Sequence, residues 1–223
     1  DEAGIEAKGI EPLQPVLHRI AAIADVHALA RAFGQTLRAD VDVLNNTNYD
    51  TENVFGLWVA QDLSDPTRYS PFLLQGGLGL PDRDYYLDPS PRMAEIRDKY
   101  RAHIAAMLEL AHLADADARA TRIFELEHKI ALAHGPRIDT EDVQKGNNHW
   151  TRAELATRAP GLDWQMFLVA AGLDRQDSFV VWQPGAVTGI AALATSQPLE
   201  TWKDYLTYHA IARRADVLPK AFD

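Results

Sequence analysis

Histidines and carboxylates are the metal donors available to this chain, which contains eight histidines and no cysteine. A helical zinc site of the type H-E-x-x-H places two histidines one turn apart with a catalytic glutamate between them, but the sequence lacks this motif. Its nearest fragment puts Glu125 and His128 on one helix face, whereas His134 lies six residues further on, about 600° of helical rotation away. His103 and His112 fall on nearly opposite faces. We therefore predict no metal ligand in this chain.

Two other chemistries are equally poorly supported. A serine nucleophile needs a tight turn such as G-x-S-x-G, which is absent. The run from Gly77 to Gly79 begins like a dinucleotide-binding loop, but Asp82 stands where the third glycine belongs. The carboxylates of Asp82 and Asp84 could act as an acid–base pair, yet alternating charge beside glycines favours a salt-bridged turn around Arg83. We assign no catalytic and no cofactor-binding residue.

The remaining conspicuous side chains have structural explanations. Asn45, Asn46 and Thr47 fit the acceptor pattern for glycosylation, a short pattern that requires a secreting host and carries no weight by itself. Aromatic residues at core-facing spacing are expected to anchor helix packing rather than to form a ligand cage. These aromatic residues are Trp150, Trp164, Trp202, Tyr205 and Tyr208.

Composition limits the class of protein. The chain has 223 residues, 47% hydrophobic and 24% charged, as expected for one large or two small globular domains. A net charge of −10 disfavours binding to nucleic acid and to anionic membrane surfaces. Without any run of 18 apolar residues, we expect no membrane span.

Helical patterns dominate the elements that must position these residues. Apolar residues recur at three- and four-residue spacing, and Asp25, Thr151 and Asp163 are placed as N-caps, Thr151 within a capping box. The predicted helices cover residues 12–24, the segment after Asp25, about 91–111, 117–133, the two short segments after Thr151 and Asp163, and the segment after Pro198.

Strand patterns are few. Apolar runs at 54–60 and 69–74, separated by a turn at Ser64–Thr67, predict one small β-hairpin near residues 53–75. A short β-rich run follows at Phe179–Trp182. Between these regions, Gln75–Pro81 holds three glycines and a proline and should form a loop. The fold class is therefore mainly α with one small hairpin.

The segment Gln75–Leu87 resembles the G-L-x-L-P-x-R-x-Y-Y segment of the neprilysin-type zinc metallopeptidases, the family of neprilysin and endothelin-converting enzyme. Other similar segments follow in family order over essentially the whole chain. They are Gly9–Leu13, Gln61-Asp62 before Asp65-Pro66, Asp142–Lys145 ahead of Asn147-Asn148, and Trp202–Leu206.

The resemblance implies a family that cleaves peptides at the amino side of hydrophobic residues, with zinc held by H-E-x-x-H and a downstream glutamate. This chain is similar only to the family's N-terminal helical region, so residues 1–223 would be a partial domain without the catalytic zinc region. The substrate-binding arginines of the family would lie before Asp1. No catalytic, cofactor-binding or metal-binding residue can be carried over.

We therefore expect a fragment of a bacterial zinc metalloendopeptidase, inactive alone, that forms scaffold and wall of the substrate cavity. The absence of an initiator Met and of a polar C-terminal tail after Leu218, together with the lack of cysteine, favours this interpretation. Its expected partners are the missing C-terminal catalytic region and short peptides, and helix faces that meet the missing region should be exposed. The alternative is a stand-alone peptide- or protein-binding module. A periplasmic or secreted location is favoured over a cytoplasmic one.

Overall fold

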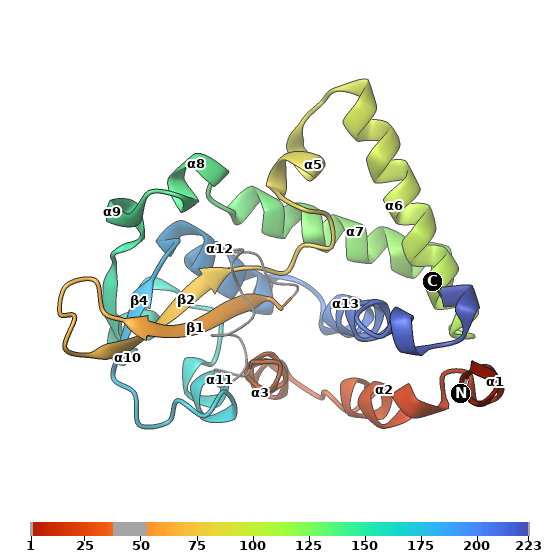
Figure 1. Cartoon of the computed structure of the whole chain (residues 1–223), viewed down its shortest axis with the longest axis horizontal. Coiled ribbons are helices and arrows are strands. Elements are labelled where there is room, and N and C mark those ends of the chain that lie inside the picture. The colour runs from red at the N-terminus through yellow and green to blue at the C-terminus, as the bar shows by residue number, and fades with distance from the viewer. Residues whose placement is uncertain (1, 38–52, 223) are drawn as a thin grey trace. The chain divides into compact units, whose positions relative to one another are not determined.

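The computed structural model describes residues 2–37 and 53–222 (Figure 1). The chain divides into two compact units. Unit 1 comprises residues 1–23, 88–126 and 198–223, and unit 2 comprises residues 24–87 and 127–197. One boundary falls inside the helix α7 (Ala116–Ala133). The glycosylation pattern at Asn45–Thr47 lies outside the described residues.

Unit 1 is helical throughout its described part. Its longest helix begins where predicted, because Ser90 accepts a hydrogen bond from the backbone N–H of Met93 and Pro91 occupies the first turn. Apart from its share of α7, the elements are α1 (Glu2–Lys8), η1 (Glu11–Leu13), α2 (Gln14–Ala21), α6 (Pro91–Leu110), α13 (Leu199–Ala212), η2 (Ala215–Val217) and η3 (Lys220–Phe222).

The last helix of unit 1, α13, is buried on most of its circumference and packs against α2 and α6. Trp202, Tyr205 and Tyr208 are buried, as predicted for core anchors. The rings of Tyr100 and Tyr208 meet edge to face at 6.2 Å between centroids. These aromatic contacts form the centre of the unit.

Unit 2 combines short helices with a small sheet, and the predicted N-caps at Asp25, Thr151 and Asp163 are confirmed. Its helices, apart from its share of α7, are α3 (Val26–Gln35), α5 (Arg83–Leu87), α8 (Arg137–Thr140), α9 (Val143–Gly146), α10 (Arg152–Arg158), α11 (Trp164–Ala170) and α12 (Pro184–Ser196). Its strands are β1 (Phe55–Gln61), β2 (Tyr69–Gln75), β3 (His149–Thr151) and β4 (Ser178–Val181).

The sheet has the strand order β1-β2-β4-β3, of which β1, β2 and β4 are labelled in Figure 1. The predicted hairpin is confirmed, with β1 and β2 antiparallel and Trp58 opposite Phe72. It is not an isolated hairpin, however, because β4 pairs parallel to β2 and β3 pairs antiparallel to β4. A two-stranded hairpin alone is marginally stable, and the added strands complete a sheet with two packed faces.

Each face of the sheet carries aromatic packing. On one face, Trp58 stacks on Phe72 at 5.1 Å, and Trp182 packs beside both rings. Phe55, at the opposite parity along β1, contacts the rings of Trp164 and Phe167 from α11 at 5.5 and 5.6 Å. The buried aromatic residues therefore fix the sheet against its helices, and the mainly α fold class is confirmed.

Helix α12 is the largest element that the sequence pattern did not predict. Its sequence begins with Pro and Gly and then runs through small and apolar residues without a polar face, so it shows no 3.6-residue periodicity. Val187 and Ile190 are among its buried residues. Across residues 2–37 and 53–222, no helix combines the length and apolar content that a membrane span requires.

Helices α3 and α11 approach each other at a glycine. A Cβ built on Gly34 would lie 2.2 Å from the carbonyl oxygen of Phe167 and 2.9 Å from the Cβ of Ala170. Because the nearest obstacle is backbone, a larger residue can be accommodated only if the helices move apart.

We predict that Gly34→Ala lowers the free energy of unfolding by about 1–3 kcal/mol, because the added methyl group overpacks the contact between α3 and α11. Gly185→Ala is the matched control, since a Cβ there meets nothing within 4 Å. Alanine also favours helix, so the control should change stability by less than about 1 kcal/mol. Urea unfolding of both variants tests this, and equal effects would contradict it.

Candidate functional site

The segments that resemble the peptidase family make polar contacts with parts of the chain distant in sequence. In unit 2, the loop and helix at Gln75–Leu87 contact the C-terminal part of α7, and the hairpin turn contacts the start of β3. In unit 1, α13 contacts the N-terminal part of α7. Each of these three sets of contacts is a polar joint, a place where polar side chains connect segments distant in sequence. The joints contain the best candidates for chemistry among the described residues.

The first joint centres on Tyr86. Its hydroxyl oxygen accepts hydrogen bonds from the backbone N–H groups of Gly79 and Leu80, at 3.2 and 2.9 Å. The same hydroxyl donates to Oε2 of Glu127 at 2.6 Å, and both side chains are buried. Burial, followed by the charge and hydrogen bond of Glu127, raises the pKa of Tyr86 far above its ordinary value. Tyr86 therefore stays protonated and acts as a fixed donor.

His134 and Gln75 hold the start of the same loop. Nε2 of His134 donates to the carbonyl oxygen of Gly76 at 2.9 Å. The side-chain amide of Gln75 donates to the carbonyl of Gly135 at 3.2 Å and accepts from its N–H at 2.8 Å. Burial lowers the pKa of His134 to about 4, and the charge of Arg83 lowers it further against the raising effect of the Gly76 hydrogen bond. His134 is thus a neutral structural donor near neutral pH.

The charged run at Asp82–Asp84 begins helix α5. Oδ1 of Asp82 accepts from the N–H of Asp84 at 2.7 Å. Nε of Arg83 points elsewhere and donates to the carbonyl oxygen of Ala131 at 3.4 Å. The predicted salt-bridged turn is therefore wrong, because Arg83 reaches the backbone of α7. Its hydrogen bond adds to the anchoring of the loop.

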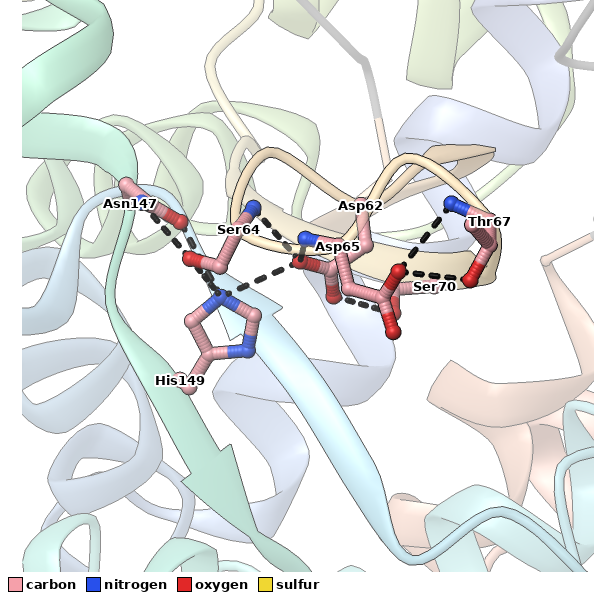
Figure 2. Close-up of polar contacts among 7 residues, drawn as sticks. All are labelled: Asp62, Ser64, Asp65, Thr67, Ser70, Asn147 and His149. Atoms are coloured by element: carbon pink, nitrogen blue, oxygen red, sulfur yellow. Dashed lines mark hydrogen bonds and ion pairs between the residues drawn. The ribbon is translucent and has the colours of Figure 1, made fainter.

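The second joint closes the turn between β1 and β2 (Figure 2). Oδ1 of Asp62 accepts from the N–H groups of Ser64 and Asp65 at 2.8 and 3.2 Å, and its Oδ2 accepts from the hydroxyl of Ser70 at 2.6 Å. Burial raises the pKa of Asp62, but these hydrogen bonds and the His149 ring outweigh it, so the pKa lies below its ordinary value. An ionised Asp62 therefore stabilises the turn.

Ser64, His149 and Asp62 have the composition of a catalytic triad without its geometry. Nε2 of His149 lies 3.2 Å from Oγ of Ser64 and 3.5 Å from Oδ1 of Asp62, and Oδ1 of Asn147 is 3.0 Å from the same nitrogen (Figure 2). In a triad, the serine and the carboxylate bind opposite nitrogens of the ring, so that one orients the base for the other. Here Ser64 and Asp62 both approach Nε2 of His149. The cluster therefore connects the hairpin turn to β3.

The third joint lies in unit 1. Asp204 is 3% exposed, and its Oδ1 accepts from Nε of Arg119 at 2.6 Å. Its Oδ2 accepts from Nε and Nη2 of Arg122 at 2.8 and 2.6 Å. A buried carboxylate is tolerated when it is paired and hydrogen-bonded in this way. These ion pairs connect α13 to α7.

The histidines weighed for metal binding are not brought together. Glu125 is exposed and His128 half-buried, while His134 contacts Gly76. The ring of His103 lies 6.5 Å from that of Tyr208, and His112 follows α6 with φ +57°. Among the described residues, no group of three or more histidines and carboxylates is placed to hold a metal ion.

Sequence reasoning missed the acidic residues at these joints. Glu127 and Asp204 are buried, and both lie on helices whose buried face the pattern does predict. An acidic residue on a buried face signals a partner, since an unpaired buried charge is costly. Asp62 appeared only within a family-like segment, because its partner His149 is remote in sequence.

The fold and its joints define a helical scaffold whose identified polar clusters are engaged in packing rather than arranged around a reacting atom. The model of the N-terminal region of peptidase family M13 matches residues 1–223. The chain belongs to this family of neprilysin-type metallopeptidases, and the resemblance inferred from Gln75–Leu87 is confirmed.

Named relatives agree with the family match. The crystal structure of the Mycobacterium tuberculosis zinc metalloprotease Zmp1 with an inhibitor is 33% identical, with a TM-score of 0.87, over 100% of this chain and 33% of that one. Neprilysin-3 of Drosophila melanogaster is 22% identical over 98% of this chain and 29% of its own length. Human endothelin-converting enzyme 1 is 23% identical over 100% of this chain and 29% of its own length. The chain thus spans about a third of these relatives.

We predict that Tyr86→Phe lowers the free energy of unfolding by about 1–3 kcal/mol, because buried Glu127 loses a donor and the N–H groups of Gly79 and Leu80 lose their acceptor. Tyr69→Phe removes the same atom from an exposed tyrosine and is the control. Denaturant unfolding should leave the control within about 0.5 kcal/mol of the parent. A similar small loss for Tyr86→Phe would exclude the anchoring role.

His134 should make the chain less stable in acid. The unfolded state takes up a proton below its ordinary pKa of 6.5, whereas the folded state resists protonation down to about 4. Stability is therefore lost as pH falls through this window, by at most about 3 kcal/mol. His134→Gln should remove this part of the pH dependence in urea unfolding at several pH values. His18→Gln, at an exposed histidine of α2, should leave it in place.

Proposed function

We propose that this chain is a non-catalytic part of a zinc-dependent endopeptidase that hydrolyses short peptides, and that it forms scaffold and part of the substrate-cavity wall. The observation that carries the proposal is the family match over the entire chain, set against relatives about three times as long. The sequence itself contains no H-E-x-x-H motif. On this proposal, the zinc chemistry is supplied by another part of the enzyme.

The residues of this chain do not fit a zinc site of their own. Within the described ranges, three of the buried potential ligands are already engaged, Glu127 by Tyr86, His134 by Gly76 and Asp204 by two arginines. Zinc needs three or four ligands converging on one point, and these groups lie in separate joints. No catalytic step is assigned to them.

Exposed apolar side chains support contact with a further part of the protein. Leu132, Ile138 and Val143 are 60%, 77% and 51% exposed at the end of α7, in α8 and at the start of α9. Large apolar residues exposed so close together in sequence are typical of surfaces that a partner covers. A missing catalytic region is the partner that the proposal requires, and a bound protein is the partner required by the alternative of a stand-alone binding module.

We also propose a periplasmic or secreted location.

Zinc content and peptidase activity test the proposal. The isolated 223-residue chain should bind no stoichiometric zinc and should not cleave a short fluorogenic peptide. The full product of its gene should bind one zinc ion and cleave the peptide. A variant of that product with the zinc-motif glutamate changed to glutamine is the control, because it should keep zinc and lose activity.

Two outcomes would overturn the proposal. The first is tight one-to-one zinc binding by the isolated chain, which would show that this chain itself holds a zinc site. The second is a native gene product that ends near Asp223 without a downstream zinc motif, which would favour the stand-alone binding module.

A further inference from the structure

Helices α3 and α11 of unit 2 lie side by side and parallel. His27, in the first turn of α3, contacts Asp163, the N-cap of α11. Near the other end of α3, Gly34 lies against Phe167 and Ala170 of α11. Both helix N-termini are therefore at the same end of the pair, where their adjacent dipoles place partial positive charge.

One carboxylate serves both helices at this end. Oδ1 of Asp163 accepts from the N–H of Met166 at 3.0 Å and so caps α11. Its other oxygen, Oδ2, lies 2.6 Å from Nδ1 of His27 on α3. Asp25 caps α3 independently by accepting from the N–H of Ala28 at 2.8 Å. The His27–Asp163 contact is thus additional to the two caps and joins the helices directly.

Few other charged side chains lie near His27, and the partial positive charge of the helix N-termini opposes its protonation. Asp25 and Arg31 are the charged residues nearest to it along the described part of α3, and neither α11 nor α12, which packs on α3, contains a charged residue. The hydrogen bond to Asp163 and then the charge of Asp163 raise the pKa of His27; desolvation opposes them, and the charge of Asp25 raises the pKa by a lesser amount. The His27 side chain is 67% exposed, so it exchanges protons freely with solvent.

We propose that His27 and Asp163 form a pH-sensitive latch, which holds the N-terminal end of α3 against α11 when His27 is protonated and loosens when it is neutral. The folded-state pKa of His27 lies above its unfolded value, so the stabilisation is fully present below about pH 6.5 and is lost as pH rises through the raised value. The close contact at Gly34 does not titrate. Loosening is therefore confined to the first turns of α3, and it depends on neither zinc nor peptidase activity.

Proton exchange at histidine C2, followed by mass spectrometry on the full chain, measures the pKa of each histidine separately. His27 should titrate above the ordinary histidine value of 6.5. Asp163→Asn is the informative variant, because asparagine still caps α11 but carries no charge. It should bring the pKa of His27 back toward that ordinary value.

Amide exchange provides the structural readout. After correction for intrinsic rates, amides in the first turns of α3 should exchange roughly two- to fivefold faster at about pH 8.5 than at about pH 5.5. His27→Gln should abolish this difference, and His18→Gln should preserve it. The proposal is overturned if His27 titrates at or below the ordinary histidine value of 6.5, if Asp163→Asn leaves the pKa of His27 unchanged, or if the exchange difference survives in His27→Gln.

Discussion

A buried carboxylate destabilises a fold unless hydrogen-bond donors saturate it, and this constraint organises each polar joint of the chain. Asp62, Glu127 and Asp204 are all less than 10% exposed. Each is bound by a donor from a separate element or a remote position: Ser70 for Asp62, Tyr86 for Glu127, and the arginine pair of α7 for Asp204. These carboxylates therefore act as connectors within their units.

The same saturation leaves the residues that could do chemistry engaged in structural contacts. A general base needs a free lone pair aimed at a substrate, and a nucleophile needs a base on the correct side. His134 is held as a neutral donor to Gly76, and Ser64 shares one nitrogen of His149 with Asp62. Membership of peptidase family M13 is consistent with this arrangement, because the chain spans only about a third of the length of its relatives.

The pKa values of two histidines of unit 2 are shifted in opposite directions, for opposite physical reasons. His134 is buried, so desolvation opposes its charge. His27 is exposed beside a carboxylate, so its charge is favoured. Among the described residues, neither histidine belongs to a group placed to hold a metal ion. Because both residues are histidines, the difference between their pKa shifts comes from their positions in the fold.

The sequence by itself determined the features whose causes are local. The caps at Asp25, Thr151 and Asp163, the long periodic helices and the family segment at Gln75–Leu87 depend on neighbours within a few residues. The hairpin pairs two strands adjacent in sequence across a short turn, with Phe55 opposite Gln75. All of these features were predicted. Tertiary structure alone decided the pairing of β4 with β2, the burial of α12 and the partners of Glu127 and Asp204. Those features depend on groups up to about a hundred residues away, and residue type and periodicity carry no information about which distant donor will reach a buried acceptor.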